Sequence, residues 1–126
     1  MKIQYLIQMD GYIRGVVKLW HNPNPNQNFS EQLVSISNLS KFKNFLILYK
    51  LSTTENDLFQ DTVSIYFNKQ INIFLYQSTG VVYGIEREIV VNDDNVYFSN
   101  SYSATPNNGA FLDNSKLIPY EVYGLN

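Results

Sequence analysis

The sequence predicts an all-β protein, an antiparallel β-sandwich of about eight or nine strands, with the jelly roll as one candidate arrangement. Three observations lead to this fold class. Apolar and polar residues alternate over many short segments, turn residues recur about every ten positions, and helical patterns are nearly absent. The 126 residues suffice for one domain, which we expect to span residues 1–126.

The first part of the chain supplies three predicted strands. Residues 2–9 and 12–20 predict two of them, joined by an Asp-Gly turn. Residues 42–51 are apolar on both faces, which favours a central strand buried on both sides. Residues 30–42 are the best helical candidate, although their β-branched and serine residues argue against a long helix.

The middle of the chain continues this pattern. Residues 63–67 and 71–77 alternate as half-buried strands do, and Lys69-Gln70 between them suggests a short hairpin connection. Residues 81–91 place their apolar side chains on one face, with Arg87 among them. We expect the opposite face of this strand to meet water.

A turn and two strands complete the prediction. Residues 92–95, Asn-Asp-Asp-Asn, are turn chemistry because these side chains hydrogen-bond nearby backbone. Residues 95–100 and 116–124 read as strands, and Pro119 predicts an edge position or a bulge because proline cannot donate to a ladder. Residues 101–115 read as a long polar loop, the kind of segment that carries function on β-sandwiches.

Composition excludes several functional classes. Only 16% of residues are charged and the net charge is −2, so we expect no nucleic-acid binding. The chain has no cysteine and one histidine, His21, which excludes disulfides, thiolate metal sites and multi-histidine sites. No apolar run reaches the roughly 18 residues of a membrane span, and the first residues lack a signal-peptide pattern. We therefore expect a soluble protein made in the cytoplasm.

Two groups of carboxylates are candidates for chemistry. Glu86 and Glu88 have a spacing that paired catalytic carboxylates could use, but a solvated strand face explains them as well. Asp93, Asp94 and Asp113 could supply oxygen ligands to calcium, but the first two also suit a turn and no known ligand-loop spacing is present. We assign no catalytic residue, no metal ligand and no cofactor.

Aromatic and amide side chains give the positive signal. The chain has ten tyrosines and 16 asparagines, and aromatic faces pack on sugars while amides bond their hydroxyls. The candidate glycan-binding residues are Tyr97, Tyr102, Asn107 and Asn108. The alternative is that tyrosine simply suits strands and that the asparagine content reflects overall composition.

The stretch LWHNPNPNQNFSEQ, residues 19–32, resembles part of a domain that recurs in phage and prophage tail and minor structural proteins, especially of Gram-positive hosts. The resemblance continues through NLSKFKNFLILYK, an arginine in a later strand and the ending LIPYEVYGLN, and it runs from about residue 17 to the C-terminus. The matching residues are Trp20, Asn22, Pro23, Pro25, Phe29, Gln32 and Arg87.

This resemblance implies a non-enzymatic β-sandwich of the virion, a tail-tip or fibre head that attaches to bacterial surface polysaccharide or teichoic acid. It also implies a homo-oligomer, with a trimer favoured, and contacts with other virion proteins. Alternatives are a structural adaptor or decoration protein without receptor binding, a bacterial carbohydrate-binding module, and a small glycan hydrolase or esterase. The hydrolase or esterase would use Glu86 and Glu88, or Asp93 and Asp94.

The opening stretch also has a physical interpretation as a crossover between two sheets. We expect Trp20 to plug one end of the sandwich. Pro23 and Pro25 would hold an extended path, because a residue before proline is pushed out of the helical region. Phe29 would then re-enter the core.

Overall fold

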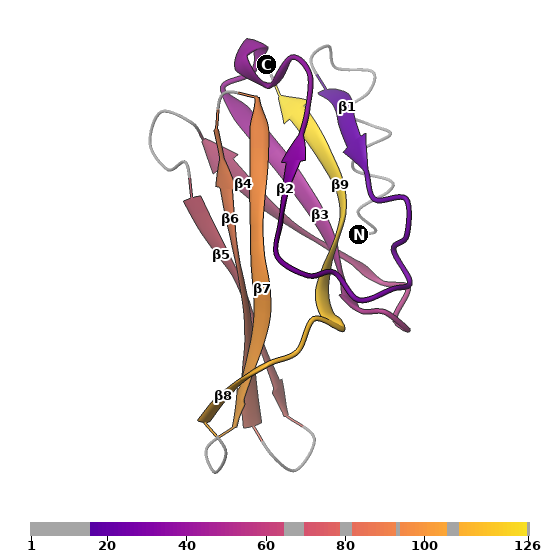
Figure 1. Ribbon diagram of the computed structural model, residues 1–126, viewed down its shortest axis with the longest axis vertical. Helices are drawn as coiled ribbons and strands as arrows, with labels where there is room; N and C mark the ends of the chain where they lie inside the picture. The colour runs from indigo at the N-terminus through magenta and orange to yellow at the C-terminus, as the bar shows by residue number, and fades with distance from the viewer. Residues whose placement is uncertain (1–15, 65–69, 79–81, 93, 106–108, 126) are drawn as a thin grey trace.

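The computed structural model describes residues 16–64, 70–78, 82–92, 94–105 and 109–125, with the backbone alone for 61–64, 70–78 and 82–83. Eight strands form two four-stranded antiparallel sheets that pack face to face, and a ninth, β8, pairs with β7 (Figure 1). The elements are β1 (Val16–His21), β2 (Gln32–Ser35), the 3₁₀ turn η1 (Leu39–Lys41), β3 (Asn44–Ser52), β4 (Leu58–Ser64), β5 (Gln70–Ser78), β6 (Val82–Val91), β7 (Asn95–Thr105), β8 (Gly109–Leu112) and β9 (Lys116–Leu125). The predicted β-sandwich is confirmed.

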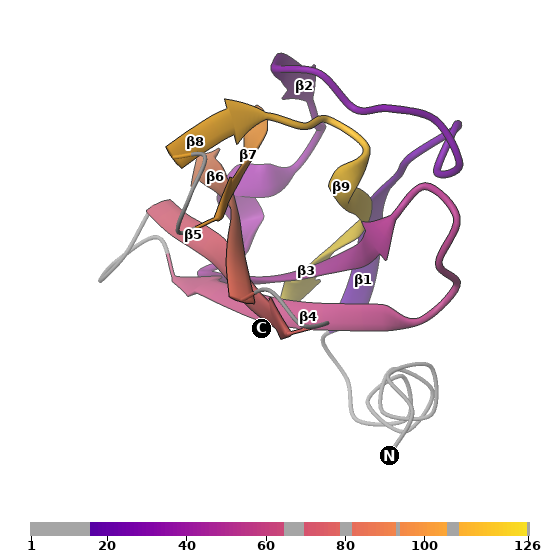
Figure 2. The same cartoon turned by 90° about the horizontal axis from the view of Figure 1, so that it is seen from below.

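Each sheet combines strands from separate parts of the chain. Sheet A has the order β1-β9-β3-β4, and sheet B has the order β2-β7-β6-β5 with β8 beside β7. The chain therefore changes sheet four times, between β1 and β2, β2 and β3, β4 and β5, and β8 and β9 (Figure 2). Because β3 and β4 pair directly and β5, β6 and β7 form a meander, this order differs from the two Greek keys of a jelly roll.

Strand β3 confirms the predicted central strand at residues 42–51. It lies between β9 and β4 and is buried on both faces. Phe45 and Ile47 face the core between the sheets, whereas Leu46 and Leu48 belong to a second cluster with Tyr123 on the other side of sheet A. A continuous apolar run thus marks a strand that has no solvated face.

Side chains from both sheets fill the core between them. The fully buried aromatic and aliphatic residues of this core include Phe45, Ile47, Ile85, Ile89, Val96, Phe98, Leu117, Ile118 and Val122. Strand β6 confirms the predicted faces of residues 84–91: Ile85, Arg87 and Ile89 are buried, while Glu86 is exposed and Glu88 is half-buried. Val81 lies outside the described residues.

The hairpin predicted between residues 63–67 and 71–77 is wrong. Strand β4 pairs with β3 in sheet A, whereas β5 pairs with β6 in sheet B. Alternation identifies a strand but does not identify its partner, and here each strand pairs with another neighbour in sequence. Lys69, the predicted strand at 2–9 and its Asp-Gly turn lie outside the described residues, and the predicted strand at 12–20 is described from Val16 as β1.

Two other segments differ from their predictions. The helical candidate at 30–42 is strand β2, which pairs with β7, followed by the single turn η1, in agreement with the low helix propensity of its β-branched and serine residues. The long loop at 101–115 is mostly the antiparallel pair of β7 and β8. Ser101 and Ser103 are buried there, and their polar side chains break the alternation of apolar and polar residues by which a strand is recognised in a sequence.

Pro119 lies at a bulge, which is one of the two positions predicted for it. Strand β9 is not an edge strand, since β1 and β3 flank it. Its register with β3 shifts between Leu48, opposite Glu121, and Tyr49, opposite Pro119. The bulge removes the need for a donor at this position.

Strands β2 and β8 pair with successive parts of the same edge of β7, residues 95–98 and 102–105. Asparagine side chains occupy the junction between them. The Asn100 Oδ1 accepts hydrogen bonds from the Glu31 N–H at 2.8 Å and from the Asn114 Nδ2 at 2.9 Å, and the Asn114 Oδ1 accepts from the Ser101 N–H at 2.8 Å. These side-chain amides supply hydrogen bonds to β7 in the gap between β2 and β8, where strand pairing stops.

Arg87 joins the two sheets through their core. Its side chain is fully buried, and its guanidinium donates to the Leu117 carbonyl at 2.8 Å, the Lys116 carbonyl at 3.1 Å and the Ser99 carbonyl. Leu117 has a left-handed backbone, with φ at 47°. Burial lowers the pKa of Arg87 to about 10, so the group remains charged at neutral pH and depends on these carbonyls for compensation.

Replacing this guanidinium should therefore destabilise the fold. Arg87→Met leaves three buried or half-buried carbonyl oxygens without their donor, and we expect the free energy of unfolding to fall by about 3 kcal/mol. Urea denaturation followed by far-ultraviolet circular dichroism measures this difference. Glu86→Gln, on the exposed face of the same strand, is the control and should change it by less than about 0.5 kcal/mol. An Arg87→Met variant as stable as the parent would contradict this role.

Candidate functional site

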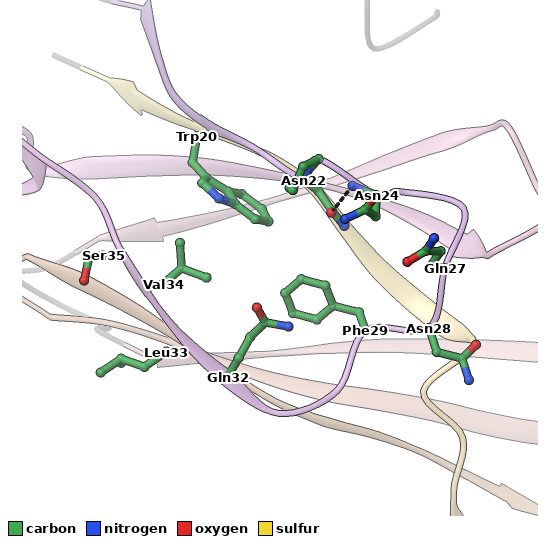
Figure 3. A pocket seen from close by; sticks show the side chains of 11 residues that line it. Trp20, Asn22, Asn24, Gln27, Asn28, Phe29, Gln32, Leu33, Val34 and Ser35 are labelled. Carbon is green, nitrogen blue, oxygen red and sulfur yellow. Dashed lines mark hydrogen bonds between the residues drawn. The ribbon is translucent and has the colours of Figure 1, made fainter.

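An open cleft of about 420 Å³ lies on one side of the sandwich, beside the segment that joins β1 to β2 (Figure 3). Strand β1 is an edge of sheet A and β2 is an edge of sheet B, so the connecting residues 22–31 cross between the sheets. The lining residues are Trp20, Asn22, Pro23, Asn24, Gln27, Asn28, Phe29, Gln32, Leu33, Val34 and Ser35. The predicted crossover is therefore present, and it forms a wall of this cleft.

Asn22 fixes the beginning of the crossover. Its side chain is buried, its Nδ2 donates to the Pro119 carbonyl at 2.8 Å, and its Oδ1 accepts from the Asn24 N–H at 2.8 Å. Its backbone N–H donates to the Tyr120 carbonyl at 2.8 Å. An asparagine suits this place because one short amide satisfies a strand carbonyl and closes the turn over Pro23.

Lys50 fixes the middle of the crossover from β3. Its side chain is buried, and its Nζ donates to the Asn26 Oδ1 at 2.6 Å, the Pro25 carbonyl at 3.2 Å and the Thr53 carbonyl at 3.5 Å. The sequence analysis missed this residue. A lysine inside the otherwise apolar run 45–51 was the available signal, because a buried ammonium needs several acceptors.

Aromatic rings form the inner side of the cleft. Ring centroids of Trp20 and Phe98 lie 5.6 Å apart, those of Phe29 and Phe98 lie 5.2 Å apart, and those of Trp20 and Phe29 lie 6.3 Å apart. The Arg87 guanidinium lies 5.3 Å from the Phe29 ring centroid. Phe29 re-enters the core as expected, whereas half-buried Trp20 closes the open side between two edge strands and not an end of the sandwich.

Amide side chains form the outer part of the cleft. Asn24, Gln27, Asn28 and Gln32 are all exposed, and the Gln32 Nε2 donates to the Ser30 carbonyl at 3.1 Å. In Figure 3 the side chains of Gln32 and Val34 point toward the Trp20 and Phe29 rings, while Leu33 between them points away. The cleft therefore combines aromatic surface with groups that both donate and accept hydrogen bonds.

The residues that carry the resemblance gather at this site. Trp20, Asn22, Pro23, Phe29 and Gln32 line the cleft. Pro25 supplies a carbonyl to the Lys50 ammonium, and Arg87 lies behind the Phe29 ring, as described above. Six of these residues are neighbours in sequence, within residues 20–32, and Arg87 is the one that the fold brings to them from a distant strand.

The predicted glycan-binding residues lie elsewhere. Tyr97 and Tyr102 are on β7 and face away from the core, on the outer face of sheet B. The Tyr97 Oη donates to the Glu31 carboxylate, and this hydrogen bond is the main reason that its pKa is raised to about 12. Tyr102 is 44% exposed. Asn107 and Asn108 lie outside the described residues.

The carboxylates considered for catalysis or calcium are not in the cleft. Glu86 and Glu88 lie on the outer face of sheet B. The Asp113 Oδ1 accepts from the Ser115 Oγ and N–H, as in an Asx turn, and Asp94 is exposed at the turn before β7. Asp93 lies outside the described residues. Within the described ranges, no three acidic, histidine or cysteine side chains are grouped to hold a metal ion.

Glu121 organises a charged cluster that the sequence analysis did not identify. Its Oε2 lies 2.9 Å from the Lys18 Nζ and 3.0 Å from the His21 Nδ1, and its Oε1 accepts from the Tyr123 Oη at 2.8 Å. Burial alone would raise the pKa of Glu121, but the hydrogen bonds from Lys18, Tyr123 and His21 outweigh burial and lower it. Burial and the bond to this carboxylate raise the pKa of Tyr123. His21 therefore has a structural partner here.

No helix among the described residues has the length and apolar character of a membrane span. No protein-family model, no curated protein and no solved structure matched this chain.

The aromatic contacts of Trp20 should contribute to stability. Because the indole is only half-buried, we expect Trp20→Ala to lower the free energy of unfolding by about 2 kcal/mol and the melting temperature by several degrees. Differential scanning calorimetry measures both. Leu33→Ala, whose side chain is 60% exposed, is the control. An unchanged melting temperature for Trp20→Ala would contradict its role in closing the sandwich.

The Glu121 cluster predicts a pH dependence of stability. A carboxyl whose pKa is lowered by folding stabilises the native state above its unfolded pKa of about 4.3, and this contribution is lost as the pH falls through the folded value. We expect the parent to lose more stability than Glu121→Gln as the pH falls below about 5. Urea denaturation from neutral to acidic pH measures this. Parallel pH profiles for the two proteins would show that the cluster contributes nothing.

Proposed function

We propose that this protein is a non-enzymatic component of a phage or prophage virion, a tail-tip or fibre head domain that attaches to glycans on the bacterial surface. The cleft between the edges of the two sheets carries the proposal. The half-buried Trp20 ring can pack against the apolar face of a sugar, and the exposed amides of the cleft can bond the hydroxyls.

The position of the cleft suits attachment. Its walls are the edge strands β1 and β2 and a crossover held at Asn22 and Lys50, so the ligand groups stand on a supported frame. Binding sites gain affinity when their groups are ordered before the ligand arrives.

The chemistry of the cleft favours binding over hydrolysis. Its described lining residues include no carboxylate, histidine or lysine to act as a general acid or base. Ser35 lines the cleft, but its Oγ donates to the Asn95 Oδ1 at 3.2 Å and has no base beside it. The two glutamates considered for glycan hydrolysis face outward from sheet B.

A trimer would compensate for weak individual sites. An open cleft with few polar contacts binds one short glycan segment weakly, and three copies on one particle raise the overall strength through effective concentration. We propose a homo-oligomer, with a trimer favoured, that contacts other virion proteins and resides in the virion after synthesis in the host cytoplasm.

A structural adaptor without receptor binding is the second candidate. The outer face of sheet B exposes Leu33 at 60%, Tyr102 at 44% and Leu112 at 54%, which are large apolar side chains for a solvated sheet face. A neighbouring virion protein or another copy of the chain would cover them. This role would use sheet B and would leave the cleft empty.

Binding of the labelled protein to intact Gram-positive cells tests the proposal, with its mass in solution measured alongside. We expect saturable binding by a trimer, and loss of binding to cells stripped of wall polysaccharide. A folded sample that binds no cells would favour the adaptor. Release of soluble sugar from the wall during the assay would contradict a non-enzymatic role. A gene that encodes a neighbouring catalytic domain would favour a bacterial carbohydrate-binding module.

A further inference from the structure

We infer that the cleft selects an uncharged glycan segment and does not bind the anionic polymers of the bacterial wall. This inference rests on the proposed attachment function and names its ligand class. Among the described residues that line the cleft, none is Asp, Glu, Lys, Arg or His. Every lining side chain is an aromatic ring, an aliphatic group, a proline, a primary amide or the single hydroxyl of Ser35.

Two cations close to the crossover, Lys50 and Arg87, are already bound to the protein. The Lys50 ammonium lies on the crossover but donates to three oxygens of the Asn26, Pro25 and Thr53 residues. The Arg87 guanidinium lies behind the Phe29 ring, is fully buried and donates to three carbonyls. Neither group can reach a phosphate in the cleft, and recognition of phosphate depends on charge-assisted hydrogen bonds from such cations.

The nearest anion is also engaged outside the cleft. Glu31 lies in the crossover, but its carboxylate accepts from the Tyr97 hydroxyl on the outer face of sheet B. The cleft therefore has no anion directed into it that would attract a cationic ligand. An anionic ligand would lose water there without a compensating charge, which is costly.

The amides match the hydroxyls of a neutral sugar. Asn24, Gln27 and Asn28 have no side-chain hydrogen bond to the described part of the chain, and Gln32 uses only one N–H for the Ser30 carbonyl. Each amide offers a donor and an acceptor, as each sugar hydroxyl does. Asn22 is different, because its Nδ2 and Oδ1 already serve the Pro119 carbonyl and the Asn24 N–H.

The size of the cleft limits the ligand to a short segment. Its volume of about 420 Å³ is near the lower end of the range of about 300–1,000 Å³ for small-molecule sites. The cleft is open, so a longer polysaccharide can extend from both ends of the bound segment. One or two sugar units would then contact the half-buried Trp20 ring and the surrounding amides.

Two variants and a matched control test this inference on the full chain. Gln27→Ala and Gln32→Ala remove exposed amides from the cleft, and Gln60→Ala removes an exposed amide from β4 at the opposite edge of sheet A. The probes are immobilised neutral oligosaccharides of hexoses and N-acetylhexosamines and purified polyglycerol-phosphate teichoic acid. Each is measured at about 50 mM and about 500 mM NaCl, because only charge recognition is strongly screened by salt.

We expect binding to at least one neutral probe that salt does not change, about tenfold weaker in each cleft variant and unchanged in Gln60→Ala. Salt-sensitive binding to teichoic acid that the cleft variants weaken would overturn the neutral ligand and leave glycan attachment standing. Glycan binding that neither cleft variant weakens would overturn the cleft as its site. A protein that binds no probe and no intact cell would overturn the attachment function itself.

Discussion

The buried guanidinium of Arg87 is the interaction on which the sandwich depends. A charge in the core is tolerated only when hydrogen-bond acceptors surround it. Here the acceptors come from β7 and from the first two residues of β9, one of which has a left-handed backbone. Arg87 on sheet B therefore holds the entry of β9 into sheet A, and β9 is the strand that β1 and β3 flank.

The same guanidinium supports the cleft from the core side. Phe29 has Arg87 near its ring on one side and Trp20 at its edge, so the crossover returns to a fixed point in the core. Asn22 and Lys50 hold the two earlier parts of the crossover to β9 and β3. The cleft thus depends on hydrogen bonds that lie beneath it and that no ligand would touch, which is how a site on a connecting segment becomes ordered.

Local patterns predicted the strands well and their surroundings less well. Alternation and continuous apolar runs located β3, β6 and β9. Successive side chains point to opposite faces of a strand, so the sequence shows directly whether one or both faces are buried. The hairpin between β4 and β5 was wrong because strand pairing is a long-range choice. The second half of β7 was predicted to be part of a loop because its inward side chains, Ser101 and Ser103, are polar although the backbone is a strand. The crossover was predicted from its prolines and Phe29, whereas the cleft beside it needs two edge strands that sequence does not place together.

The asparagines show why composition alone does not identify which side chains are available to a ligand. Several of them, including Asn22, Asn26, Asn100 and Asn114, bond backbone or a buried ammonium at points where ladders end or chains cross. An amide is short and has both a donor and an acceptor, so it replaces a missing backbone partner. The same property makes an exposed amide a partner for a sugar hydroxyl. What separates the two uses is whether the protein already satisfies the group, and only the folded chain shows this. Around the aromatic rings of the cleft, exposed amides remain available, and this is the physical basis for placing an uncharged ligand there.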